Sequence, residues 1–156
     1  MHGENVSSDI SGLIGQYAHG NEPSHHIIYM YSTLGHPEKA AKWLKVVIDS
    51  MYKVGPDGLS GNDDCGQMSA WYVLSTLGFY PVNPANGTFV FGSPQVKKAS
   101  IRLPNEAKFV IKALHFSDKN YYQEHPRLNK QKLERNFIRY SEIMQGGCLT
   151  FQMSNK

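Results

Sequence analysis

The spacing of apolar residues changes once along this chain of 156 residues, and the change constrains the fold more than any other feature. Before Gly78 the apolar residues recur at helical spacing, whereas after it they alternate in short runs typical of strands. We therefore predict an α+β fold in which helices come first and strands follow. Turn-forming residues in segment 80–86 place a boundary there, between a helical part (1–82) and a β-rich part (83–156).

Four segments of the first part are candidates for helices, the first of them a short helix or an irregular lead-in: 8–19, 24–34, 36–51 and 63–77. The second and the fourth are apolar on most faces, and such helices are normally buried. Four helices of this kind cannot cover one another well. We infer that the chain is a piece of something larger or that it associates with itself.

The second part predicts a small antiparallel β region. Its β-type runs are 88–91, 97–103, 108–113 and 148–153. Segment 118–145 is polar with few apolar residues, and it predicts no particular element. A hydrophobic content of 40% is sufficient for a packed core.

Charge is divided unevenly between the two parts. Residues 1–94 hold four Lys or Arg and eight Asp or Glu, hence −4, whereas residues 95–156 hold twelve and five, hence +7. Such asymmetry indicates two different surfaces. The basic residues carry no nucleic-acid-binding signature, so we do not expect a nucleic-acid partner.

Other features exclude several classes of protein. Every apolar run is shorter than the roughly 20 residues that a membrane helix needs. The first residues show no secretory signal, as would also hold for a mature or truncated chain. Cys65 and Cys148 lack the spacing of a zinc site and are best interpreted as two buried thiols.

The stretch GNDDCG, residues 61–66, places Asp63 and Asp64 directly before the fourth apolar segment. One interpretation is that Asn62 or Asp63 caps the helix, with Asp64 in its first turn near the positive end of the helix dipole. The alternative is chemical, because a carboxylate fixed at the rim of a core can activate water or bind a cation. Taken alone, the motif favours the capping interpretation.

The stretch HGNEPSHH, residues 19–26, is a second candidate site. It approaches the zinc motif H-E-x-x-H, but Asn21 stands where the first histidine should be and Pro23 interrupts the helix. His25 and His26 are then ordinary hydrogen-bonded helix residues. The functional alternative is a polar pocket whose donors and acceptors bind sugar hydroxyl groups, with oxygen atoms suited to a hard cation such as Ca²⁺.

Three stretches together resemble glycoside hydrolase family 92: HGNEPSHHIIYMY, PDGLSGNDDCGQMSAWYVLSTLGFYPVNPANGTFVFGSP and MQGGCLTFQM. The resemblance spans nearly the whole chain. It implies a calcium-dependent, inverting exo-α-mannosidase of the kind common in Bacteroides, with a β-sandwich domain followed by an (α/α)₆ barrel. This chain resembles only the C-terminal end of that fold, so its apolar segments would be the last helices of a partial (α/α)₆ toroid.

The same resemblance assigns roles in the acidic motif. Asp64 matches the general base of the family. A second family acid aligns with Asn62, where this chain has an amide, and the neighbouring Asp63 is the candidate to orient the water instead.

It also places His19, Asn21 and Glu22 in the sugar- and calcium-binding region, with Asn21 and Glu22 as the candidate Ca²⁺ ligands. The general acid of the family is a glutamate in an upstream motif that this sequence lacks. We therefore expect the chain to need the N-terminal part of the same enzyme and to be inactive alone.

The resemblance further implies mannose-containing glycans as ligands, α-1,2-linked ones foremost, and a periplasmic, secreted or cell-surface location. Two rival interpretations remain: a carbohydrate-binding module without activity, and a structural piece whose site residues have no role alone. Glycan binding without turnover favours the first, and failure to bind calcium indicates an incomplete site.

Overall fold

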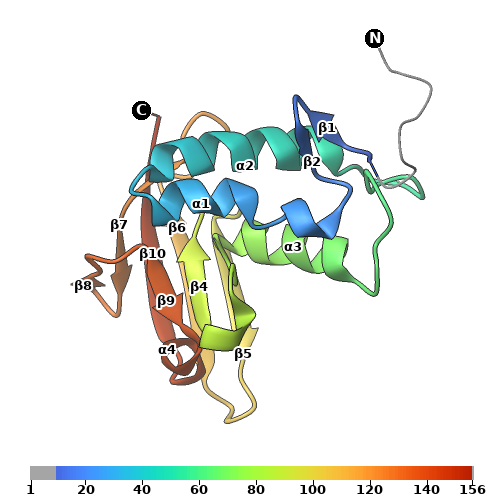
Figure 1. Ribbon diagram of the computed structural model, residues 1–156. Coiled ribbons are helices and arrows are strands. Elements are labelled where there is room, and N and C mark those ends of the chain that lie inside the picture. Colours follow the sequence, from blue (N-terminus) through green and yellow to red (C-terminus); the bar gives the residue numbers. More distant parts are fainter. Residues whose placement is uncertain (1–9, 156) are drawn as a thin grey trace, which may run out of the picture.

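The computed structural model describes residues 10–155, apart from the side chain of His125. The three longer helices gather on one side of the molecule together with a small hairpin, and the larger sheets and a short fourth helix lie on the other (Figure 1). The helices are α1 (Ile27–Thr33), α2 (Pro37–Met51), α3 (Gln67–Leu77) and the short α4 (Tyr140–Met144), with single 3₁₀ turns η1 (Glu22–Ser24) and η2 (Pro84–Asn86).

The three longer helices confirm the helical prediction for the first part. Helix α2 begins at Pro37. Proline suits the first turn of a helix, because the N–H that it lacks would have no hydrogen-bond partner there. Helix α3 begins at Gln67, later than predicted, and ends at Gly78, whose φ of 98° is readily adopted only by glycine.

The helical interpretation of segment 8–19 is wrong for the residues that the structure describes. Strands β1 (Leu13–Ile14) and β2 (Tyr17–Ala18) form an antiparallel hairpin there, with Leu13 opposite Ala18. Gly15 has a φ of 59°, which suits the first position of a two-residue hairpin turn and interrupts a helix.

The strands form two larger sheets. One contains β3 (Phe79–Tyr80), β4 (Thr88–Phe91) and β9 (Phe137–Arg139) in that order. The other has the order β5 (Lys98–Arg102), β6 (Lys108–Leu114), β10 (Gly147–Ser154), β7 (Tyr122–Leu128) and β8 (Gln131–Lys132). All four predicted strands are present.

The prediction of a purely antiparallel β region is wrong for one pair of strands. Strand β10 runs parallel to β6, because the chain crosses through β7, β8, β9 and α4 before it returns beside β6. Most of these intervening elements lie in the polar segment 118–145, for which the sequence predicted nothing. Only isolated residues there, such as Ile138 and Ile143, are buried.

Two apolar clusters lie next to each other where the helices meet the strands. Tyr80 of β3 and Val90 of β4 pack with helix residues in the first cluster, whereas Phe109, Phe151 and their neighbours form the second under the large sheet. A Cβ atom on Gly92 would lie 2.6 Å from a methyl group of Leu44. Helices α1 and α2 therefore pack directly against the backbone at the end of β4. The boundary between two parts of the chain at 80–86 stays a prediction.

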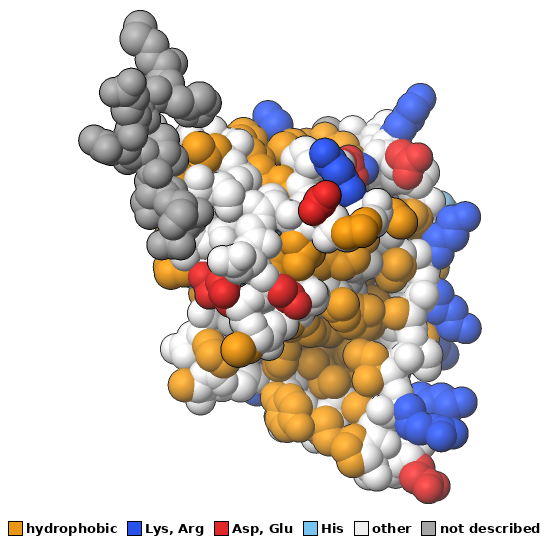
Figure 2. All heavy atoms as spheres, turned by 90° about the vertical axis from the view of Figure 1, so that its right-hand side faces the viewer, with side chains coloured by type: hydrophobic (Ala, Val, Ile, Leu, Met, Phe, Trp, Pro, Cys, Tyr) orange, Lys and Arg blue, Asp and Glu red, His pale blue; other side chains and the backbone are white. Residues whose placement is uncertain are grey.

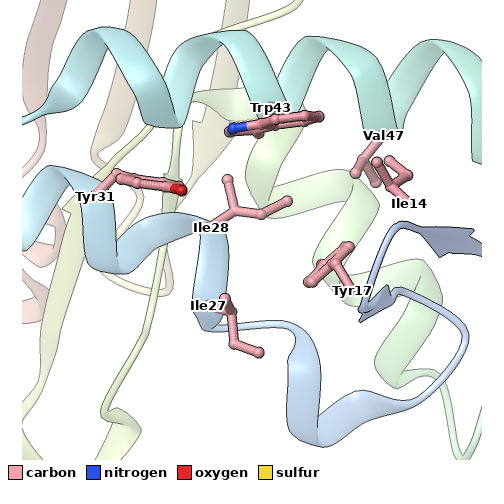
Figure 3. Close-up of a pocket in the computed structure, with 7 residues that line it drawn as sticks. All are labelled: Ile14, Tyr17, Ile27, Ile28, Tyr31, Trp43 and Val47. Atoms are coloured by element: carbon pink, nitrogen blue, oxygen red, sulfur yellow. The ribbon is translucent and has the colours of Figure 1, made fainter.

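One face of the helical side is apolar and hollow (Figure 2). A groove of about 210 Å³ lies between α1, α2 and the β1–β2 hairpin (Figure 3). Ile27 and Met30 of α1 are 45% and 40% exposed, as expected of a helix that lacks a neighbour. The partial toroid itself stays a prediction.

Candidate active site

A polar cleft of about 360 Å³ combines both candidate motifs. It lies where the chain enters α1 and α3. Its lining consists of two loop segments and one serine: Gly20, Asn21 and Glu22, then Gly61, Asn62 and Asp64, and Ser11. Four of the six predicted site residues thus line one cleft.

Two glycines allow the loops to approach so closely. A Cβ atom on Gly61 would lie 2.5 Å from the carbonyl oxygen of Gly20, and one on Gly20 would lie 2.8 Å from the carbonyl oxygen of Ser60. Contacts this short with backbone atoms exclude any side chain. The sequence HGNE and the sequence GNDD therefore meet because each carries glycine where the backbones touch.

The backbone at Asp64 has an uncommon conformation. Asp64, Cys65 and Gly66 have φ angles of 45°, 58° and 91°, three left-handed residues in succession. Each non-glycine residue in this region costs roughly 1 kcal/mol, so the turn is held by its surroundings. The turn leaves Asp64 exposed and on the cleft wall, not in the first turn of α3. It also leaves Cys65 exposed, and Cys148 is only partly buried, so the prediction of two buried thiols is wrong.

Glu22 and Asp64 interact across the cleft. The pKa of the Glu22 carboxyl is lowered, first by a hydrogen bond from its own backbone N–H and then by a hydrogen bond with the Asp64 side chain. Burial opposes the shift, and the nearby His25 contributes to it. The lowered pKa favours the ionised form of Glu22, so the side chains of Glu22 and Asp64 influence each other's protonation.

Asp63 has a different role from its neighbour. Its side chain accepts a hydrogen bond from the backbone N–H of Ser69 at 2.9 Å, in the first turn of α3. This N–H has no partner within the helix, so Asp63 caps it, although the N-cap position itself is Gly66 and not Asn62 or Asp63 as predicted. Asp63 does not line the cleft, and its role in orienting water stays a prediction.

His19 lies below the cleft with an exposed fraction of 0%. Its Nδ1 lies 2.8 Å from the hydroxyl of Tyr17, and its Nε2 lies 2.7 Å from the hydroxyl of Tyr52. Because Tyr52 donates its own proton to the carbonyl oxygen of Met68, it must accept one from His19 Nε2. His19 is therefore the neutral Nε2–H tautomer, and its contact with substrate stays a prediction.

His25 is fixed in the same way. Its Nε2 donates to the carbonyl oxygen of His19 at 3.0 Å, so its Nδ1 accepts from the amide of Gln67 at 3.2 Å. The indole N–H of Trp71 donates to the carbonyl oxygen of His25 at 3.0 Å. This buried network ties the loop of Glu22 to helix α3, and thus holds one cleft wall against the other.

Burial keeps both imidazoles neutral. Loss of hydration lowers the pKa of His19 to about 3, and the neighbouring His25 adds to this shift. Burial also lowers the pKa of His25, against the hydrogen bond to His19 and the charge of Glu22. Neither ring offers a free nitrogen to a metal ion, which is consistent with the weak match to the zinc motif.

The sequence did not identify every residue of this site. Ser11, Gly20 and Gly61 line the cleft, and Gln67 and Trp71 hold its walls together. The glycines next to Asn21 and Asn62 were the available signal, since a repeated Gly-Asn-acid pattern marks two similar turns. Nothing in the sequence indicated that Gln67 reaches His25.

The cleft fits Ca²⁺ in the chemistry of its donor atoms but not in their number. Its donors are the oxygen atoms that a hard cation prefers, from Asn21, Glu22, Asn62 and Asp64. Yet Ca²⁺ takes six to eight oxygen ligands. Within the described residues, no group of three or more His, Cys, Asp or Glu side chains is placed to hold a metal ion. The donor chemistry fits, and the number of ligands requires further oxygen atoms from elsewhere.

Comparison with known proteins identifies the class. Residues 1–155 match the model of the glycosyl hydrolase family 92 catalytic domain, so the chain belongs to this family. A secreted glycosidase of Arthroderma benhamiae, otherwise uncharacterised, is 29% identical over 140 residues, which are 88% of this chain and 18% of that protein.

Solved structures agree. A family GH92 α-mannosidase from Bacteroides thetaiotaomicron, in complex with mannoimidazole, is 43% identical with a TM-score of 0.90, over 95% of this chain and 20% of that one. An inverting GH92 mannosidase from strain VPI-5482 is 42% identical with a TM-score of 0.84, over 91% and 19%. The chain therefore spans about a fifth of the length of these relatives.

Proposed function

We propose that this chain is the C-terminal part of an inverting exo-α-mannosidase that hydrolyses α-mannosidic bonds, α-1,2 bonds foremost, in N-glycans or mannans. The observation that carries the proposal is the open polar cleft that Asp64 and Glu22 line together with Asn21 and Asn62. Membership of glycosyl hydrolase family 92 and the likeness to α-mannosidases support the substrate class.

In this proposal Asp64 is the general base. An inverting glycosidase needs one carboxylate to activate water and one carboxylic acid to protonate the leaving oxygen, about 6.5–9.5 Å apart. Asp64 is exposed at the cleft and is held by the left-handed turn, so it can take a proton from water without a change of backbone. Glu22 is then a substrate-binding side chain in the same cleft.

Asn21 and Asn62 supply the remaining polar contacts on the cleft wall. An amide offers both donor and acceptor atoms, as the hydroxyl groups of a mannose ring require. Bound Ca²⁺ would supply a positive charge for the hydroxyl oxygens. Asn21 and Glu22 would hold it together with oxygen atoms from the rest of the enzyme, including the part that carries the general acid.

The proposed location is outside the cytoplasm, in the periplasm, at the cell surface or secreted. The support is the secreted relative of Arthroderma benhamiae. In the part of the chain that the structure describes, none of the helices is both long and apolar enough to cross a membrane.

The purified chain tests the proposal first. We expect no turnover of an aryl α-mannoside, because the loss of a general acid alone costs roughly 10²–10⁴-fold in rate. Turnover by the chain alone would contradict the assignment of the acid to the missing part.

A chimera tests the base. This chain would replace the matching fifth of the Bacteroides thetaiotaomicron α-mannosidase, and Asp64→Asn should lower kcat by about 10²–10⁴-fold with little change in KM. Asp57→Asn, in an exposed loop outside the cleft, is the matched control. A chimera whose kcat survives Asp64→Asn would overturn the proposal.

A further inference from the structure

The large sheet carries a row of basic side chains across its outer face. The strand register pairs Lys98 with Lys112, Lys112 with Thr150, Thr150 with Arg127, and Arg127 with Lys132. All four basic residues are exposed. Because adjacent strands lie about 4.8 Å apart, this basic row crosses five strands over about 19 Å.

The alternation of the strands separates the basic row from the core. Ile111 and Ala113 flank Lys112 in the sequence and are buried, as is Phe151 next to Thr150. Arg102 and Lys108 form a second like-charged pair on the outer face, two residues along the strands beyond Ser100 and Val110. The outer face therefore collects much of the positive charge of residues 95–156.

Few carboxylates offset this charge. Glu134 pairs with Lys132 at 3.0 Å at the end of the row, and Glu124 accepts a hydrogen bond from Ser154 at 2.9 Å. Among the residues whose side chains are described, Lys98 and Lys112 form no ion pair. Figure 2 shows Lys and Arg side chains gathered along one edge of the molecule.

Fold stability does not explain the basic row. Like charges directly opposite each other on adjacent strands are destabilising, and here two such pairs, Lys98–Lys112 and Arg127–Lys132, lie in one row. The repulsion between these basic side chains lowers the stability of the sheet. A partner with repeated negative charges would remove the repulsion.

We propose that the basic row binds an acidic polysaccharide, a glycan chain with repeated carboxylate, sulfate or phosphate groups. Four cations lie in one row across five neighbouring strands, which suits a linear polymer that carries repeated negative charges. The row itself contains no aromatic side chain, whereas single-stranded nucleic acid sites combine charges with aromatic rings. It also contains no apolar side chain that could insert into a membrane.

This binding surface is distinct from the cleft. Strands β5, β6, β7, β8 and β10 contribute no residue to the cleft lining, so the basic row does not depend on the proposed hydrolysis. A glycosidase that holds an acidic polymer on this face would stay on its polymeric substrate while the cleft acts on neutral sugar branches.

The test is a binding titration of the purified chain with polygalacturonate and dextran sulfate at several salt concentrations. We expect affinity for both that falls steeply as salt rises, and weaker binding to unsubstituted mannan, single-stranded DNA and vesicles of phosphatidylglycerol and phosphatidylcholine. The double variant Lys112→Glu/Arg127→Glu should bind the acidic polymers at least about tenfold more weakly.

The matched control is Lys39→Glu/Lys53→Glu, which changes the net charge equally on exposed residues of the helical side. We expect it to change binding less than about twofold. Equal losses of affinity in both double variants would show that net charge alone explains the binding, and would overturn the proposal. Tighter binding to DNA or to the vesicles than to the polysaccharides would overturn it as well.

Stability provides an independent readout. Lys112→Glu would face Lys98 with the opposite charge, so the melting temperature of the double variant should not fall. If that variant does not fold, Lys112→Gln/Arg127→Gln removes the charges without reversing them. It must also weaken binding to polygalacturonate, and unchanged binding would overturn the proposal.

Discussion

At the residue scale, two adjacent aspartates have different roles because the backbone turns between them and the helix. Asp63 accepts the N–H of Ser69 in the first turn of α3, whereas Asp64 lies on the cleft beside Glu22. The left-handed conformation of Asp64 and Cys65 separates the two side chains. One acid stabilises the element that positions the other.

We predict that Asp63→Ala lowers the free energy of unfolding by about 1 kcal/mol, because a helix N–H loses its acceptor. Urea denaturation followed by circular dichroism measures this change. Asp57→Ala, in the exposed loop before the cleft, is the control and should be close to neutral. Equal effects of the two substitutions would contradict the capping role.

The buried imidazole of His19 predicts a pH dependence of stability. Its pKa is lowered to about 3 in the folded protein, against an ordinary value of 6.5. Above pH 6.5 the ring is neutral in both states and stability does not change. Between pH 6.5 and 3 the unfolded chain binds a proton that the folded protein does not, so stability falls by roughly 1 kcal/mol per pH unit.

Thermal unfolding between pH 4 and pH 7 measures this slope. We expect His19→Gln to flatten it, although His25 retains part of it because its pKa is lowered too. His36→Gln makes the same substitution at an exposed position and is the matched control. An unchanged slope in His19→Gln would show that the ring is not held neutral by burial.

At the scale of elements, glycines end two helices in the same conformation but in different surroundings. Gly35 follows α1 at a φ of 83° with open space where a Cβ atom would lie. Gly78 ends α3 at a φ of 98°, where a Cβ atom would lie 3.1 Å from Pro94 and 3.2 Å from the ring of Phe151. The first position needs only the backbone freedom of glycine, and the second also needs its small size.

We therefore predict that Gly35→Ala lowers the free energy of unfolding by about 1 kcal/mol through backbone strain alone. Gly78→Ala should cost more, because the added methyl group also crowds the contact between α3 and β10. Chemical denaturation of both variants compares the two costs. Equal costs would mean that Phe151 and Pro94 give way without penalty.

At the scale of the whole molecule, the apolar groove between α1, α2 and the hairpin is uncovered in the described part of the chain. It is lined by Ile14, Tyr17, Ile27, Ile28, Tyr31, Trp43 and Val47 (Figure 3). Since the chain spans about a fifth of its relatives, the remainder of such an enzyme would be a natural cover. In isolation, the chain can cover this apolar surface only with another copy of itself.

We predict that the isolated chain self-associates through this groove, in proportion to its concentration. Sedimentation velocity at increasing concentrations measures the association, and Ile27→Asp should weaken it at least about tenfold by placing a charge in the groove. Val54→Asp makes the same change in an exposed loop and should have no effect. A chain that stays monomeric, or equal effects of both variants, would contradict the role of the groove.

Local signals in the sequence predicted much of the fold. Pro37, the apolar spacing of α2 and Gly78 act through nearest neighbours, so they identify helix boundaries without knowledge of the tertiary structure. The alternation in β6 and β10 has the same origin. The hairpin at residues 13–18 was missed because its apolar residues also fit a helical spacing, and its glycines decided the outcome.

The candidate site divides in the same way. The types of residue, namely paired Asp, Asn and Glu next to glycine, were visible in the sequence and led to the correct family. What the sequence could not provide was that His19 and Asp63 face away from the cleft while Ser11 lines it. The direction of His19 follows from its contacts with Tyr17, Tyr52 and Trp71, which are far apart in the sequence. Asp63 is directed by the backbone N–H of Ser69.

The sequence by itself therefore determined the helical and extended segments outside 8–19 and 118–145, and it placed oxygen-bearing side chains at two glycine-rich turns. Only the tertiary structure decided that those turns share one cleft, that β10 runs parallel to β6, and that four basic side chains form one row. The physical reason is the separation along the chain over which each kind of interaction acts. Backbone preferences act over a few residues, whereas a cleft and a strand register depend on close contacts between residues far apart in the chain.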